Sequence, residues 1–122
     1  MKIVMGLFIS LILSVALAQL PAPKRSVPTL IITPALQITL YRWTRTVERT
    51  AGRNSITLVY RSTQGDKIFV YHHRDLLAHG WTKVSETSKP GQHAVTYQKG
   101  GHKASLQVTQ SGERVAVTVR QD

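Results

Sequence analysis

Histidine and carboxylate side chains are the residues of this chain best suited to chemistry. His72, Asp75 and His79 follow one another at intervals of three and four residues, so a helix would place them on one face. Asp75 and His79 could then grip a divalent metal together. Zinc sites normally use three or four protein ligands, so we expect no metal centre here and interpret the two side chains as an ordinary helix ion pair.

A second group of side chains could support acid–base catalysis, namely His72, His73, His93 and Glu86. Such a set would imitate a small histidine-dependent nuclease if two titrating groups came within hydrogen-bond reach of one substrate. Nothing in the spacing requires these residues to meet. The sequence also has no G-x-S-x-G elbow, no H-E-x-x-H pair and no glycine-rich phosphate loop. We therefore expect no catalytic residues and no cofactor.

The strongest binding feature is a run of aromatic and basic residues, made up of Tyr41, Arg42, Trp43, Arg45, Arg49 and Arg53. Aromatic rings can stack on bases or sugars while arginines hold phosphates. If Tyr41 and Trp43 point outward, the segment is a ligand face. If both rings are buried, they belong to the core and the arginines merely line an exposed side. The burial of these two rings decides between the two interpretations.

The charge of the chain favours anionic partners. There are 16 Lys and Arg residues against 6 Asp and Glu, a formal net charge of +10. Such a field attracts nucleic acid, acidic cell-wall polymers, acidic glycans and acidic proteins, but charge alone selects none of them. The chain has no cysteine, which excludes disulfides and thiolate metal sites and leaves packing and sheet pairing to hold the fold.

The N-terminal residues predict export. Residues 1–18 combine a positive start, an apolar run and the small-x-small end Ala16-Leu17-Ala18, the pattern of a cleaved signal peptide. The run is too short for a comfortable membrane span, so we expect a periplasmic or extracellular protein with no stable transmembrane span after cleavage. Residues 19–34 hold four of the five prolines and predict an extended linker. Residues 35–122 are then a single domain.

The hydrophobic pattern of that domain predicts strands around one helix. Residues 36–40 alternate as a strand, and the apolar parity switches at Leu40-Tyr41, so a bulge lies there or two short strands meet. Residues 55–61 are rich in β-formers. The T-x-x-D pattern at Thr63 is expected to cap a helix that ends at Gly80.

Further strands follow the helix, and residues 103–109 and 114–120 alternate most cleanly between apolar and polar side chains. Trp81 is placed to close the interface between helix and sheet. We predict an α+β fold in which one amphipathic helix packs on a five-stranded antiparallel sheet, in the order ββαβββ.

The helix and its exit also carry a recognisable order of residues, Ile68-Phe69-Val70-Tyr71-His72, Leu76 and Gly80-Trp81, and a meander with Thr96-Tyr97-Gln98-Lys99-Gly100 follows. This order resembles small exported bacterial domains of unknown function whose helix reads V-x-x-Y-Y-x-x-x-L-x-x-x-G-W. The resemblance covers residues 55–119 and departs at His72, where the pattern has Tyr. It implies an envelope protein without known catalytic residues.

The function expected from these observations is that of a noncatalytic envelope or extracellular accessory domain. It would bind an anionic polymer or an acidic partner through its basic surface. Two alternatives remain open, a small secreted hydrolase such as a nuclease and a structural subunit of an envelope complex.

Overall fold

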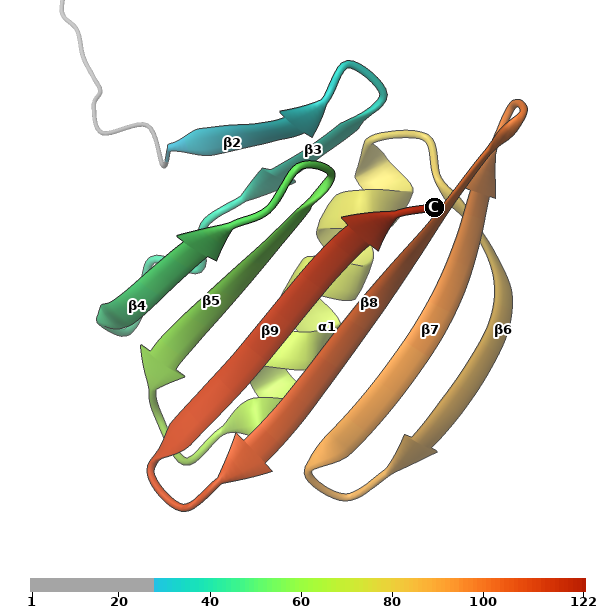
Figure 1. Ribbon diagram of the computed structural model, residues 1–122. Helices are drawn as coiled ribbons and strands as arrows, with labels where there is room; N and C mark the ends of the chain where they lie inside the picture. Colours follow the sequence, from blue (N-terminus) through green and yellow to red (C-terminus); the bar gives the residue numbers. More distant parts are fainter. Residues whose placement is uncertain (1–27) are drawn as a thin grey trace, which may run out of the picture.

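The structure is a computed structural model that describes residues 28–122. The predicted signal peptide and the first part of the predicted linker lie outside these residues. Within them, one helix and eight strands form a six-stranded sheet and a two-stranded sheet, so the described chain is mostly β (Figure 1). No helix between residues 28 and 122 is long and apolar enough to span a bilayer.

The larger sheet is antiparallel throughout, in the order β4-β5-β9-β8-β7-β6. Its strands are β4 (Thr46–Ala51), β5 (Ser55–Arg61), β6 (Thr82–Lys89), β7 (Gln92–Lys99), β8 (His102–Ser111) and β9 (Arg114–Gln121). Strand β9 lies between β5 and β8, so the C-terminal strand joins the part of the sheet before the helix to the meander after it. Glycines with positive φ at the β6–β7, β7–β8 and β8–β9 turns allow the tight connections.

The expected five-stranded sheet in the order ββαβββ is wrong. Four strands follow the helix instead of three, and a separate two-stranded sheet precedes β4. Residues 36–39, expected in the large sheet, pair instead with residues 29–33. Strand β6 lies at the edge of the large sheet and exposes all eight of its side chains. The parity switch at Leu40-Tyr41 is the place where the chain leaves one sheet for the other.

The two-stranded sheet is the hairpin of β2 (Thr29–Thr33) and β3 (Leu36–Thr39). Residues 29–33 of the predicted linker are therefore a paired strand. Leu36 and Ile38 are fully buried and belong to the same core as the large sheet. The Thr33 hydroxyl donates a hydrogen bond to the Gln121 side chain, which ties the hairpin to the end of β9.

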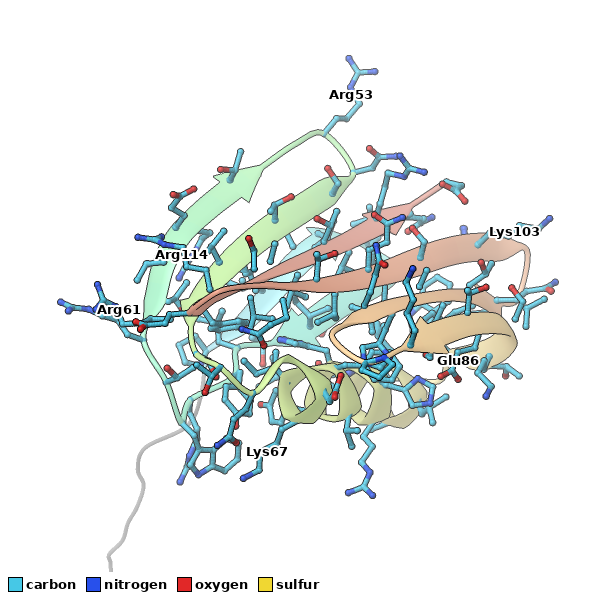
Figure 2. The ribbon with its side chains drawn as sticks, turned by 90° about the horizontal axis from the view of Figure 1, so that it is seen from below. Arg53, Arg61, Lys67, Glu86, Lys103 and Arg114 are labelled. Atoms are coloured by element: carbon cyan, nitrogen blue, oxygen red, sulfur yellow. The ribbon has the colours of Figure 1, made fainter. Side chains whose placement is uncertain are left out.

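Helix α1 (Gly65–Ala78) covers one face of the large sheet (Figure 2). Its buried side chains include the predicted stripe Ile68, Phe69, His72 and Leu76, and Trp81 closes the interface at 2% exposure. Gly80, with φ +95°, ends the helix as predicted.

The start of the helix differs from the prediction at Thr63. The N-cap residue is Gln64 and makes no side-chain capping bond. The Gly65 N–H donates instead to Oε1 of Gln110 on β8 at 2.6 Å. The cap is thus supplied by a residue distant in sequence, which a local motif cannot predict.

Candidate ligand-binding groove

A groove of about 870 Å³ lies on the outer side of the helix, away from the sheet. Three parts of the chain form its walls, namely residues 39–44, the loop of residues 62–64 and the outer face of α1. Figure 2 shows Lys67, one of the lining residues, projecting from α1 on the side opposite the sheet. Pockets that hold small ligands commonly have volumes of 300–1,000 Å³, so a ligand of several rings fits this space.

Three aromatic rings form one wall of the groove. Tyr41 is 8% exposed and Trp43 is 64% exposed. Of the two rings whose burial the sequence left open, Tyr41 therefore belongs to the core and Trp43 to the surface. Their centroids lie 5.2 Å apart. Tyr71 of α1 completes the cluster, with its centroid 5.1 Å from that of Tyr41 and 5.6 Å from that of Trp43. The cluster, Tyr41, Trp43 and Tyr71, is called the aromatic wall below.

The backbone that carries the aromatic wall is held by hydrogen bonds from the core and the helix. The Tyr41 N–H donates to the Tyr60 hydroxyl at 3.1 Å, and the Tyr71 hydroxyl donates to the Leu40 carbonyl at 2.9 Å. The Thr44 hydroxyl donates to the Arg61 carbonyl. Residues 40–44 have no regular secondary structure, yet these bonds hold the backbone on both sides of Trp43.

Positive charge surrounds the exposed indole. The Arg42 guanidinium lies 5.2 Å from the Trp43 ring centroid, a cation–π contact. Lys67 and Arg74 are exposed and line the groove from the helix. Burial, and secondarily the nearby Asp75 carboxylate, raise the pKa of Tyr71, so its phenol stays neutral and able to donate. The groove therefore offers flat apolar surface next to cations.

One carboxylate stands within this basic groove. Asp75 accepts hydrogen bonds from the Thr39 N–H at 2.7 Å and from the Thr39 hydroxyl at 3.1 Å. Its side chain is 12% exposed. The carboxylate fastens the end of β3 to the helix and also presents an acceptor to the groove.

The predicted binding residues fall into two sets. Tyr41 and Trp43 line the groove, and Arg42 lies against Trp43. Arg45, Arg49 and Arg53 are exposed but are not among the lining residues, and Figure 2 shows Arg53 at the far side of the sheet from Lys67.

Sequence reasoning missed three lining residues on the helix, Lys67, Tyr71 and Arg74. They follow at intervals of four and three residues and so share one helix face. That spacing could have indicated a binding face on the helix, but a polar helix face is usually just exposed to solvent.

The metal candidates form a local pair. Nδ1 of His79 lies 3.2 Å from Oδ1 of Asp75 and 2.8 Å from the Asp75 backbone carbonyl oxygen. Within residues 28–122, no three histidine, cysteine, aspartate or glutamate side chains are grouped to hold a metal ion.

The histidines considered for catalysis lie in separate environments. His72 is fully buried, and its Nε2 lies 3.0 Å from the Tyr60 hydroxyl. Burial lowers the pKa of His72 to about 4. His73 and His93 lie elsewhere, each stacked on Phe69 with ring centroids 5.6 Å and 4.0 Å away. His72 therefore cannot act on the same substrate as the other two.

His93 belongs to a chain of polar contacts at the surface. Its Nε2 lies 2.7 Å from Oδ1 of Asp66, and its Nδ1 lies 2.9 Å from Oγ of Ser88. The Ser88 hydroxyl is also 2.7 Å from Oε2 of Glu86, to which it can donate. Hydrogen bonds from Ser88 and Lys83 lower the pKa of Glu86. A serine, a histidine and an aspartate thus meet, in an arrangement that the sequence did not predict.

Comparison with known proteins identifies the class to which this fold belongs. A family model described as START domain-like matches residues 44–119, which include the whole of α1 and the large sheet except the last two residues of β9. The chain therefore belongs to the START domain-like family. The match leaves out the β2–β3 hairpin, Tyr41 and Trp43. No curated protein and no solved structure matches the chain.

Proposed function

We propose that this protein is an exported, noncatalytic accessory domain that binds an anionic polymer in the groove beside helix α1. The observation that carries the proposal is Trp43, which is 64% exposed while packed against Tyr41 and Tyr71. Exposed apolar surface of an indole ring is unfavourable in water. A ligand that covers the ring would remove this surface from water and gain binding free energy.

Charge and rigidity support the same function. Arg42 lies against Trp43, and Lys67 and Arg74 line the groove. The excess of Lys and Arg over Asp and Glu draws anions toward the domain from a distance. Since hydrogen bonds already hold residues 40–44, little ordering of the site is needed on binding. We expect affinities of about micromolar Kd, weakening as salt is added.

The proposal can be tested by tryptophan fluorescence, because the chain has two tryptophans in opposite environments. Trp43 is exposed and Trp81 is 2% exposed. Heparin added at low ionic strength should shift the Trp43 emission to shorter wavelength and protect it from a soluble quencher. The Trp43→Phe variant leaves Trp81 as the remaining tryptophan and should show almost no change. Binding to heparin that does not weaken between low and high salt would contradict the charge mechanism.

A small hydrolase remains the second candidate because Ser88, His93 and Asp66 are in contact. This order of groups is that of a nucleophile, a base and a carboxylate that orients the base. However, the Ser88 hydroxyl also faces Glu86, which competes with His93 for its proton. Incubation with RNA, DNA, peptidoglycan and an activated ester is the test. Turnover that disappears in both Ser88→Ala and His93→Ala would replace the proposed binding function.

A further inference from the structure

We infer that the polymer bound in the groove is an acidic polysaccharide, a chain of uronic-acid type sugars; this inference rests on the proposed binding function and names its ligand class. Three features of the groove carry it, namely its continuation beyond the aromatic wall, its hydroxyl-rich lining, and the carboxylate that it contains.

The groove continues past the start of the helix. A second hollow of about 410 Å³ shares Thr63, Gln64 and Lys67 with the first. It extends to Gly91 in the β6–β7 turn and to Gln110 on β8. Lys67 is therefore positioned where the two hollows join. A linear ligand of several units can occupy both hollows, with one of its negative charges at Lys67.

The lining between the charges also presents hydroxyl and amide groups, from Thr39, Thr44, Ser62, Thr63 and Gln64. The Thr39 and Thr44 hydroxyls already donate to Asp75 and to the Arg61 carbonyl, so they offer a ligand acceptor positions only. A sugar ring carries several hydroxyls, which can donate hydrogen bonds to these acceptors and accept them from the remaining donors. A phosphodiester backbone offers acceptors almost alone, so these acceptor positions would go unused.

Asp75 favours the same class of ligand. Its carboxylate lines the groove and takes two hydrogen bonds from Thr39, while an ionised carboxylate has about four acceptor positions. A sugar hydroxyl can donate to a position that remains. A phosphodiester linkage has no hydroxyl to donate to this carboxylate and would place its own negative charge against it, which is repulsive. The carboxylates of a uronate chain can face Arg74 and Lys67 while its hydroxyls face Asp75.

The aromatic wall fits a sugar ring as well. The C–H groups of a pyranose face carry slight positive charge, and the face of an indole ring carries negative charge. Trp43 provides that face at the mouth of the groove, 5.6 Å from Tyr71. A sugar ring over Trp43 would thus bring its neighbouring unit toward the hydroxyl-lined part of the groove.

Four probes of six units test the inference, namely an oligouronate, a neutral oligoglucose, oligo-dT and polyphosphate, each titrated by calorimetry at low and moderate salt. The oligouronate should bind about tenfold or more tightly than each of the others. Trp43→Ala should weaken it about tenfold, as for the loss of a stacked ring. Lys67→Gln and Thr63→Val should each weaken it about threefold. Arg53→Gln, which removes one positive charge outside the groove, should change it less than twofold.

Asp75→Asn separates the ligand classes. Removal of the carboxylate charge should weaken oligouronate binding and strengthen oligo-dT binding, both by about threefold. A melting curve first shows whether the variant is folded, and Thr63→Val, at an exposed residue, tests hydroxyl recognition by the groove separately.

The outcomes distinguish the inference from the function on which it rests. If oligo-dT or polyphosphate binds most tightly and still requires Trp43, the inference is overturned and the proposed function stands. If no probe binds, or if Arg53→Gln weakens binding as much as Lys67→Gln does, both are overturned.

Discussion

The Tyr60 hydroxyl lies 3.0 Å from Nε2 of His72 in the core between helix and sheet. The same hydroxyl accepts the Tyr41 N–H at 3.1 Å. Burial lowers the pKa of His72 to about 4, so its ring is neutral near pH 7. Burial also raises the pKa of Tyr60 to about 12. One tyrosine thus connects a buried histidine on α1 to the backbone of the segment that carries Trp43.

Acid should destabilise the protein through His72. The pKa of His72 is about 4 in the folded protein and 6.5 in the unfolded chain, so between these values the unfolded chain binds the extra proton. The free energy of unfolding should therefore fall by up to about 1.4 kcal/mol for each pH unit of acidification in this range. Urea denaturation at several pH values between 4 and 7 measures the slope.

The His72→Gln variant is the control for this prediction, since its amide oxygen can accept from Tyr60 but does not titrate in this range. The other four histidines of the chain remain in the variant, so the difference between the two slopes isolates His72. An equally steep slope in the variant would show that another group causes the acid sensitivity.

The two tryptophans should differ sharply in their effect on stability. Trp81 is 2% exposed and Trp43 is 64% exposed. Trp81→Ala should lower the free energy of unfolding by about 3–5 kcal/mol, and Trp43→Ala by about 1 kcal/mol or less. Chemical denaturation monitored by circular dichroism measures both. A large loss of stability in Trp43→Ala would mean that this ring serves the fold and not a ligand.

Asp75 should control whether the β2–β3 hairpin stays attached. Asp75→Ala leaves the Thr39 N–H and hydroxyl without their acceptor, at a cost of about 2 kcal/mol. Hydrogen exchange should then quicken in residues 29–39 while β5, β8 and β9 keep their protection. Glu113→Ala in the exposed β8–β9 turn is the matched loss of a carboxylate and should leave exchange in the hairpin unchanged.

Two adjacent glycines in the β7–β8 turn should respond differently to alanine. Gly100 has φ +59°, whereas Gly101 has no positive φ, and a Cβ atom at either position meets open space. Gly100→Ala should therefore cost about 1 kcal/mol from backbone strain alone, while Gly101→Ala should be neutral or slightly stabilising. Equal melting temperatures for the two variants would contradict this account of the turn.

The sequence predicted the elements better than their arrangement. The helix, the stripe of Ile68 and Leu76, the stop at Gly80 and the burial of Trp81 follow from local spacing, and the structure confirms them. Strand β2 escaped because it lies in the proline-rich stretch interpreted as a linker, and the sequence did not reveal that residues 36–39 pair with it and not with the large sheet. Hydrogen bonds to β9 and α1 place the hairpin, and these contacts join residues far apart in sequence.

The sequence predicted part of the binding surface and not the groove. Tyr41 and Trp43 stood out in an aromatic and basic run, but the third ring of the aromatic wall, Tyr71, and the lining residues Lys67 and Arg74 come from the helix. Only the fold brings these residues together. The opposite burial of Tyr41 and Trp43 depends on the Tyr41 hydrogen bond to Tyr60, a contact that no local pattern reveals.

The most direct test of the central claim is an NMR titration of the ¹⁵N-labelled protein with the six-unit oligouronate. The account predicts that the Trp43 indole N–H and the amides of residues 39–44, 62–67 and 70–75 shift together. The buried Trp81 indole should not shift, nor should Thr57 of β5 and Thr118 of β9, which are paired on the sheet face away from the helix. Shifts spread over exposed arginines such as Arg114 and Arg120, with the Trp43 indole unmoved, would contradict it.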